Sequence, residues 1–139
     1  MLDISQIHHS PEHTDAAVQA LADSGRRAAL GYFEGRGELS RYPDDARRVK
    51  EQHFSSSDQL LTMFMGGEIY LPGYERAWQI GRELGVPIAA HVLGNFGMPA
   101  AFDERIRAGA LGPDNHFIHM TAMSDEAWRA TADAGATVS

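Results

Sequence analysis

Two histidines occupy the positions in this sequence that best suit chemistry. His91 lies at the end of the apolar run 87–92, and His119 lies at the end of the next one, 116–120. In a parallel α/β protein the carboxyl ends of the strands form the rim where ligands bind. Neighbouring strands are about 4.8 Å apart. The two imidazoles are therefore predicted to be close enough to share a metal ion or a substrate.

The direction of these side chains follows from strand geometry. Successive side chains alternate between the two faces of a strand, so Ala89 and His91 should face one side, and Ala90 and Val92 the other. A small residue beneath His91 suits the crowded interior of a barrel. The competing interpretation is that each histidine is buried and satisfied by one backbone hydrogen bond, without a chemical role.

The chain holds seven histidines, and the other five are weaker candidates. His8 and His9 are adjacent, whereas two metal ligands on one face of a strand need the spacing His-x-His. We expect local hydrogen bonds from them, in the turn before the first helix, rather than metal binding. His13 and His53 suit a helix face and a solvated loop. His116 precedes His119 by three residues and should face away from it.

Short apolar runs alternate with amphipathic runs, and Gly, Pro or Asp separates them. The runs typical of strands are 4–7, 27–32, 60–65, 88–92, 117–120 and 136–138. The runs typical of helices are 11–24, 44–52, 74–84, 102–108 and 124–134. Ser10 and Ser124 are the expected N-caps of the first and last helices.

The alternation predicts an α/β fold with a parallel sheet and right-handed crossovers. Two architectures fit it: an open doubly wound sheet, and an arc of a (β/α)8 barrel. Periodicity alone does not choose between them.

Composition excludes several classes of protein. The length of 139 residues, with 43% hydrophobic and 22% charged residues, predicts one globular domain. Twelve basic and nineteen acidic residues leave a net charge of −7, so neither nucleic acid nor an anionic membrane is an expected partner. The absence of cysteine excludes disulfide scaffolds and thiolate zinc sites. Neither a membrane-spanning run nor a signal peptide is visible, and we expect a cytoplasmic protein.

Several segments of the chain resemble the amidohydrolase superfamily. They are Ser-Pro-Glu-His-Thr-Asp-Ala-Ala at 10–17, Gly-Val-Pro-Ile-Ala-Ala-His-Val at 85–92, Phe-Ile-His-Met at 117–120, and the stretch from Ser-Asp-Glu-Ala-Trp at 124–128 to the end. The nearest branch is that of cytosine-deaminase-like and triazine-hydrolase-like enzymes. The resemblance covers nearly the whole chain. It implies a distorted (β/α)8 barrel with a catalytic zinc or iron ion at the carboxyl ends of its strands.

The resemblance also implies roles for the two strand-end histidines. His91 matches the metal ligand of the fifth barrel strand. His119 matches the catalytic histidine of the sixth strand, which binds or orients the attacking water and the substrate. The implied reaction is hydrolytic deamination, or hydrolysis of another C–N bond, in a small and often cyclic molecule. A divalent metal lowers the pKa of bound water towards about 7 for such an attack.

The chain departs from the family pattern at three places. It lacks the first-strand His-x-His, and the eighth-strand Asp would lie beyond Ser139. Gly94 replaces the glutamate often found three residues after the fifth-strand histidine. Because a catalytic zinc ion normally has three protein ligands, we expect residues 1–139 to be one partial barrel domain. It would hold about strands two to seven of an amidohydrolase and be inactive alone.

Two alternatives to the enzymatic interpretation remain open. The chain could be a non-catalytic α/β module that binds a small molecule, or one that serves oligomerisation. An open arc of a barrel exposes unpaired backbone at both outer strands and apolar interior surface. We therefore also expect a homo-oligomer that forms through these edges.

Overall fold

Six strands alternate with five helices in the computed structural model of the chain, which describes residues 1–139. The strands are β1 (Leu2–Asp3), β2 (Ala28–Tyr32), β3 (Leu61–Gly66), β4 (Ile88–Leu93), β5 (Asn115–Thr121) and β6 (Thr137–Val138). The helices are α1 (Pro11–Asp23), α2 (Ala46–His53), α3 (Tyr74–Leu84), α4 (Met98–Arg107) and α5 (Asp125–Asp133). Every neighbouring pair of strands is parallel.

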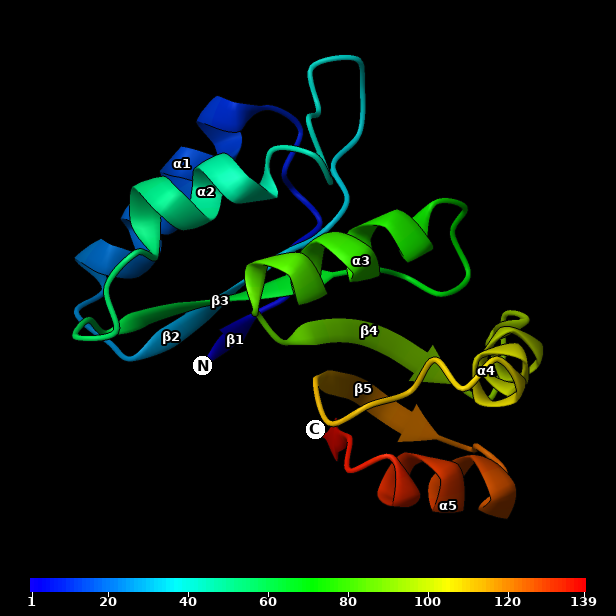
Figure 1. Cartoon of the computed structure of the whole chain (residues 1–139). Helices are drawn as coiled ribbons and strands as arrows, with labels where there is room; N and C mark the ends of the chain where they lie inside the picture. The colour runs from blue at the N-terminus through cyan, green and yellow to red at the C-terminus, as the bar shows by residue number, and fades with distance from the viewer.

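The sheet order decides between the two predicted architectures. The strands lie side by side in chain order, from β1 to β6. A doubly wound sheet reverses its direction of winding at a switch point, and this sheet has none. The sheet curls instead, with the helices on its outer side, as Figure 1 shows. The fold is therefore a parallel β/α half-barrel, which confirms the predicted arc of a (β/α)8 barrel and not the doubly wound sheet.

Serine side chains fix where the first and last helices begin. The Ser10 side chain accepts a hydrogen bond from the His13 backbone N–H at the start of α1, where Pro11 is the first helical residue. Ser124 does the same for the N–H of Ala127 at the start of α5. Each cap satisfies a backbone donor that the helix itself leaves free. Both caps were expected from the sequence.

Two predicted boundaries are wrong. The first strand is Leu2–Asp3 rather than 4–7, because the Asp3 carboxylate accepts the Ser5 backbone N–H at 3.0 Å and turns the chain away from the sheet. Helix α4 begins at Met98 rather than near 102. Gly97, in the left-handed conformation with φ of 74°, is its N-cap residue.

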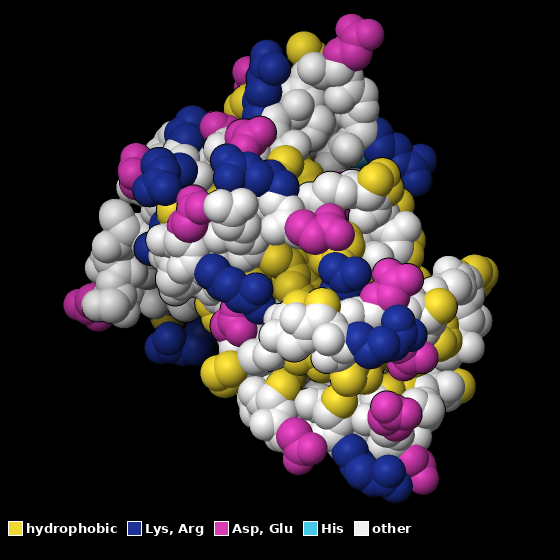
Figure 2. Space-filling model, turned by 45° about the vertical axis from the view of Figure 1, so that its right-hand side comes forward, with side chains coloured by type: hydrophobic (Ala, Val, Ile, Leu, Met, Phe, Trp, Pro, Cys, Tyr) yellow, Lys and Arg dark blue, Asp and Glu magenta, His cyan; other side chains and the backbone are white.

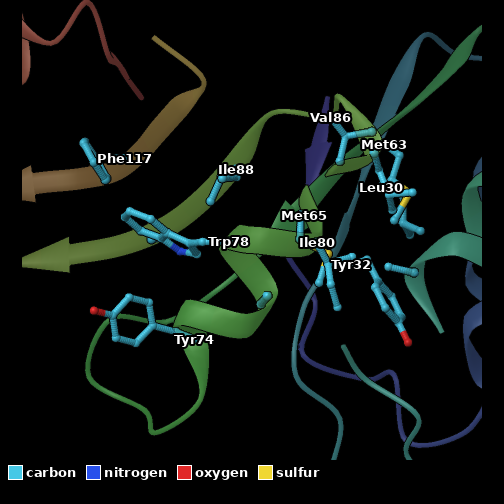
Figure 3. Packing of buried hydrophobic residues seen from close by; sticks show 14 of the residues in the cluster. Leu30, Tyr32, Met63, Met65, Tyr74, Trp78, Ile80, Val86, Ile88 and Phe117 are labelled. Carbon is cyan, nitrogen blue, oxygen red and sulfur yellow. The ribbon is translucent and has the colours of Figure 1, made fainter. Parts of the chain in front are cut away.

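The main core lies between the outer face of the sheet and the helices. It contains 25 buried hydrophobic residues. Trp78 of α3 lies over the sheet near Ile88 and Phe117, as Figure 3 shows. Phe117 also meets Phe102 of α4 edge to face, with ring centroids 5.0 Å apart. These aromatic contacts attach α3 and α4 to the strands that carry the two predicted site histidines.

A second, smaller cluster lies on the inner face of the sheet. Phe33, Ala89 and Ile118 form it. Ala90 and Val92 belong to the outer core instead. The predicted alternation along β4 is therefore confirmed, and it places the His91 side chain on the inner face of the sheet.

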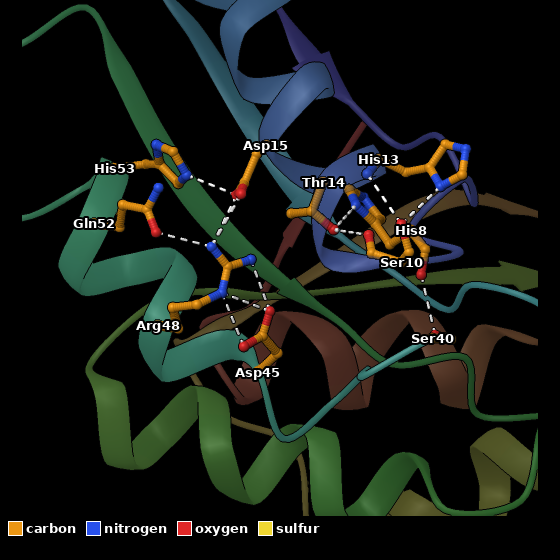
Figure 4. Close-up of polar contacts among 10 residues, drawn as sticks. All are labelled: His8, Ser10, His13, Thr14, Asp15, Ser40, Asp45, Arg48, Gln52 and His53. Carbon is orange, nitrogen blue, oxygen red and sulfur yellow. Dashed lines mark hydrogen bonds and ion pairs between the residues drawn. The ribbon is translucent and has the colours of Figure 1, made fainter. Parts of the chain in front are cut away.

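Ion pairs connect the first two helices on the outside of the half-barrel. Arg48 of α2 contacts Asp15 of α1 at 2.9 Å and Asp45 at 2.8 Å, and His53 also contacts Asp15 at 2.9 Å (Figure 4). On the face seen in Figure 2, basic and acidic side chains are interspersed over the helices. None of the five helices has both the length and the apolar character that crossing a membrane requires.

Candidate functional site at the strand ends

The two predicted histidines meet on the inner face of the half-barrel. The ring centroids of His91 and His119 are 5.7 Å apart, and their planes differ by 38°. His91 is partly buried near the end of β4, and His119 is exposed near the end of β5. The juxtaposition inferred from strand ends is therefore confirmed.

An irregularity in β5 places His119 on this face. The register between β4 and β5 shifts at Val92–Leu93, so that Val92 pairs with His119 but Leu93 pairs with Thr121. His119 and Met120 have positive φ angles of 78° and 52°. Such a bulge re-aims a side chain, because it breaks the alternation of faces along the strand.

The same irregularity corrects the expectation for His116. Its ring lies 5.9 Å from that of Phe64, which packs against the inner cluster. His116 therefore shares the inner face with His119 instead of facing away from it. The prediction assumed unbroken alternation between the two residues, and the bulge removes that assumption.

A buried carboxylate holds His91. Both oxygens of Glu68 contact this residue: Oε1 contacts the ring Nδ1, and Oε2 accepts the backbone N–H at 3.0 Å. The Glu68 side chain is 0% exposed. The hydrogen bond that Glu68 accepts from the ring raises the pKa of His91 above its usual value, against the opposing effect of partial burial. His91 therefore keeps a proton more readily than a free histidine does.

Glu68 is itself held by residues from other parts of the chain. Its backbone N–H donates to Glu34 Oε1 at 3.1 Å, and Gln6 Nε2 donates to Glu68 Oε1 at 3.1 Å. The Tyr42 hydroxyl lies 2.9 Å from the Gly66 carbonyl oxygen and 3.3 Å from Glu34 Oε1. Burial raises the pKa of Glu34, whose other oxygen is buried without a partner.

The sequence predictions did not include this carboxylate network. One signal could have identified its central member, because Glu68 follows the apolar run 60–65 and the glycines that end it. It thus occupies the carboxyl end of a parallel strand, the same kind of position that drew attention to the histidines.

An open pocket of about 550 Å³ lies beside His91. Most of its wall is apolar, and the polar side chains in it are few, as in many small-molecule sites. Its lining residues are Ile4, Gln6, Tyr70, His91, Leu93, Phe96 and Met98. His91 therefore both neighbours His119 and lines this pocket.

The chain does not assemble a complete metal site. No group of three or more His, Cys, Asp or Glu side chains in it could hold a metal ion. His91 and His119 offer imidazole nitrogens, which zinc accepts, but a catalytic zinc ion normally takes three protein ligands. The two histidines thus fit as part of a metal site and not as the whole of it.

Gly94 stands where the family resemblance leads one to expect a glutamate. A Cβ atom on Gly94 would lie 2.3 Å from the Ala122 carbonyl oxygen, closer than real contacts allow. The Gly94 N–H donates to the Thr121 carbonyl at 2.8 Å. This close approach of β4 and β5 leaves no room for a larger residue.

The adjacent histidines before α1 form hydrogen bonds within the protein, as expected, but two of the three reach residues distant in the sequence rather than local ones. The two ring nitrogens of buried His8 contact Thr14 Oγ1 at 3.1 Å and the Gly31 carbonyl oxygen at 3.2 Å. His9 Nδ1 accepts the Arg36 N–H at 2.8 Å. These bonds attach the segment before α1 to its surroundings.

Solved structures with this fold are known, although no protein-family model matches the chain and no curated protein is significantly similar in sequence. The chain is similar to an adenosine deaminase from Xanthomonas campestris with bound zinc. The TM-score is 0.68 and the identity 18%, and the match covers 90% of this chain and 32% of that one. It is also similar to a mutant of the atrazine chlorohydrolase TrzN from Arthrobacter aurescens TC1, in complex with zinc and atraton. There the TM-score is 0.69 and the identity 15%, over 99% of this chain and 36% of that one.

Both structural neighbours hold zinc. The chain shares its fold with a part of each neighbour. The chain spans about a third of the length of each neighbour. The resemblance inferred from short motifs is thus confirmed at the level of the fold, and the partial coverage fits a segment of a barrel.

Proposed function

We propose that this chain forms one wall of the active site of a metal-dependent hydrolase, with His91 as a metal ligand and His119 as a catalytic residue. The observation that carries the proposal is the pair of imidazoles 5.7 Å apart at the carboxyl ends of β4 and β5. The zinc bound in both structural neighbours supports it.

The same neighbours and the pocket support a proposal for the substrate class. One neighbour is a deaminase and the other a chlorohydrolase. For this chain we propose hydrolysis at a carbon that bears an amino or comparable leaving group, in a small cyclic molecule. The pocket of about 550 Å³ beside His91 is large enough for such a molecule. A bound zinc or iron ion would supply Lewis acidity.

Each histidine has a separate task in this proposal. His91 is held by Glu68 and presents its remaining nitrogen to the ion. His119 is exposed, so its ring can approach water and substrate. Because these two residues do not complete a metal site, we propose that the further ligands lie outside these 139 residues and that the chain alone is inactive.

Zinc titration of the metal-free chain by calorimetry tests the proposal. We expect weak binding of one ion, and His91→Ala should weaken it at least about tenfold, whereas His119→Ala, which removes the proposed catalytic residue, should weaken it less. His53→Gln, which removes a histidine on α2, is the matched control and should bind like the wild type. Zinc binding that survives His91→Ala unchanged would contradict the proposed ligand role of His91.

A non-catalytic small-molecule-binding module is the second candidate. Two observations favour it: the mostly apolar pocket beside His91, and the absence of a three-ligand group in the chain. In that case the chain should bind no zinc at millimolar concentration. It should still bind small cyclic compounds, and chemical-shift changes of Leu93 and Met98 in NMR titrations should report this binding.

A further inference from the structure

Glu68 is a carboxylate with no access to solvent. Its side chain is 0% exposed, and it does not line the pocket. Burial of a carboxylate is costly unless its oxygens are paired and hydrogen-bonded. The partners of Glu68 therefore indicate what this residue does in the fold.

Gln6 Nε2 donates to Oε1 of the carboxylate at 3.1 Å, and the other two side-chain contacts go to one residue. Glu68 contacts the ring Nδ1 of His91 with Oε1 and the backbone N–H of His91 with Oε2, the latter at 3.0 Å. A group that holds both the backbone and the ring of one residue restricts the rotation of that ring about its side-chain bonds. Glu68 thus fixes the orientation of the imidazole relative to β4.

The contact also determines where the proton of the neutral ring lies. Glu68 accepts the Gln6 amide with one oxygen and the His91 backbone N–H with the other. We infer that it accepts from the ring as well, so that Nδ1 carries the hydrogen. A neutral imidazole has one N–H, and Nε2 consequently keeps its lone pair. No protein group bonds to Nε2, and the ring forms part of the pocket wall.

We propose that Glu68 is the positioning residue of this site. Glu68 holds His91 in the Nδ1–H tautomer and leaves the Nε2 lone pair free at the pocket. The value of that lone pair as a metal ligand rests on the proposed function, whereas the tautomer itself does not. Glu34 assists by accepting the Glu68 N–H at 3.1 Å, which anchors the segment after β3.

The variant Glu68→Gln provides a sharp test because it keeps the shape of the side chain. Glutamine has one oxygen, and the His91 backbone N–H can only donate. The oxygen of Gln should therefore take the backbone N–H, and its NH2 group should face Nδ1. The ring must then accept at Nδ1, so the hydrogen moves to Nε2.

Long-range ¹H–¹⁵N NMR of the metal-free chain, labelled with ¹⁵N-histidine, reads the tautomer directly. The spectrum is recorded at a pH where the ring is neutral, and His91→Gln identifies the His91 signals by their loss. We expect the Nδ1–H pattern in the wild type and the Nε2–H pattern in Glu68→Gln. Glu51→Gln, on the exposed side of α2, is the control and should keep the wild-type pattern.

Two results would overturn the inference. One is an Nε2–H tautomer of His91 in the wild type, which decides the matter even if Glu68→Gln fails to fold. The other is an unchanged tautomer in a folded Glu68→Gln variant. A role of Glu68 in stability alone would lower the melting temperature without moving the ring proton.

Zinc titration separates this inference from the proposed function. If the wild type binds zinc through His91, Glu68→Gln should weaken that binding by about 10- to 100-fold, the usual effect of losing a carboxylate that orients a histidine ligand. Equal zinc affinity in the two proteins would contradict the positioning role. An Nδ1–H tautomer in a chain that binds no zinc would overturn the proposed function and leave the positioning role intact.

Discussion

The histidines of this chain differ most in what surrounds their two ring nitrogens. His8 is 2% exposed, and protein groups occupy both of its ring nitrogens: Thr14, drawn in Figure 4, and the Gly31 carbonyl oxygen. His91 has a carboxylate on one ring nitrogen, and it lines the pocket. Burial lowers the pKa of His8, whereas Glu68 raises that of His91. The two residues therefore respond to pH in opposite senses.

Acidification should destabilise the fold through His8. Its pKa in the folded state is below the usual value of 6.5, so its contribution to stability is present above pH 6.5 and is lost as the pH falls through the folded-state pKa. We expect the free energy of unfolding, measured with urea between pH 7.5 and 5, to fall less steeply in His8→Asn than in the wild type.

The test compares two curves of unfolding free energy against pH, that of the wild type and that of His8→Asn. Their difference isolates His8, because His91 contributes to the pH dependence of both proteins in the opposite direction. Its raised pKa gives stability that is present at low pH and lost as the pH rises through the folded-state value. His13→Asn removes an exposed histidine and should follow the wild-type curve. Parallel curves for His8→Asn and the wild type would contradict the assignment to His8.

Only part of the residue-scale site could be predicted from the sequence. His91 and His119 follow from strand ends, because apolar runs mark the strands and parallel strands share an edge. Glu68 looks like a loop residue after two glycines, and its partners Gln6 and Glu34 are distant in sequence. Their convergence depends on the curl of the whole sheet, which local patterns do not specify.

At the scale of elements, local chemistry predicts most of the half-barrel. Helix α3 lies at Tyr74–Leu84, where the amphipathic pattern places it. Capping serines mark the starts of α1 and α5. There are two exceptions. In β1 the Asp3 carboxylate ends the strand through a bond with Ser5 that apolar patterning does not reveal, and α4 begins earlier than predicted, at Met98.

The Ser124 cap should contribute measurably to stability. Its side chain accepts the Ala127 N–H at 3.1 Å, and loss of such a cap costs about 1 kcal/mol. We expect Ser124→Ala to lower the free energy of urea unfolding by that amount, and Ser124→Asp to retain most of it. Ser57→Ala, at an exposed loop position, is the control. Equal losses in Ser124→Ala and Ser57→Ala would show that the cap has no specific effect.

At the scale of the whole molecule, the half-barrel has two outer strands. β1 pairs only with β2, and β6 pairs only with β5. The backbone groups on their free sides have no strand partner, and such edges readily pair with other chains. The inner face also carries the apolar residues Phe64 and Ile4, which are only partly buried. These features motivate a prediction about assembly.

We propose that the chain self-associates through these outer strands. Light scattering coupled to size-exclusion chromatography should give a mass above the 15.2 kDa of one chain. Added salt should strengthen the association, because it screens the mutual repulsion of chains with a net charge of −7. Val138 of β6 is 36% exposed, so Val138→Lys places a charge on the edge without filling the core.

Lysine on an edge strand hinders edge-to-edge pairing, and Val138→Lys should therefore shift the chain towards the monomer. Glu126→Lys adds a positive charge on the exposed side of α5 and is the matched control. If general charge set the assembly, the control would change the mass as well, since both variants reduce the net negative charge. Only pairing through β6 makes Val138→Lys dissociate the assembly while Glu126→Lys leaves it intact. A wild-type monomer that persists at high concentration and high salt would contradict the proposed assembly altogether.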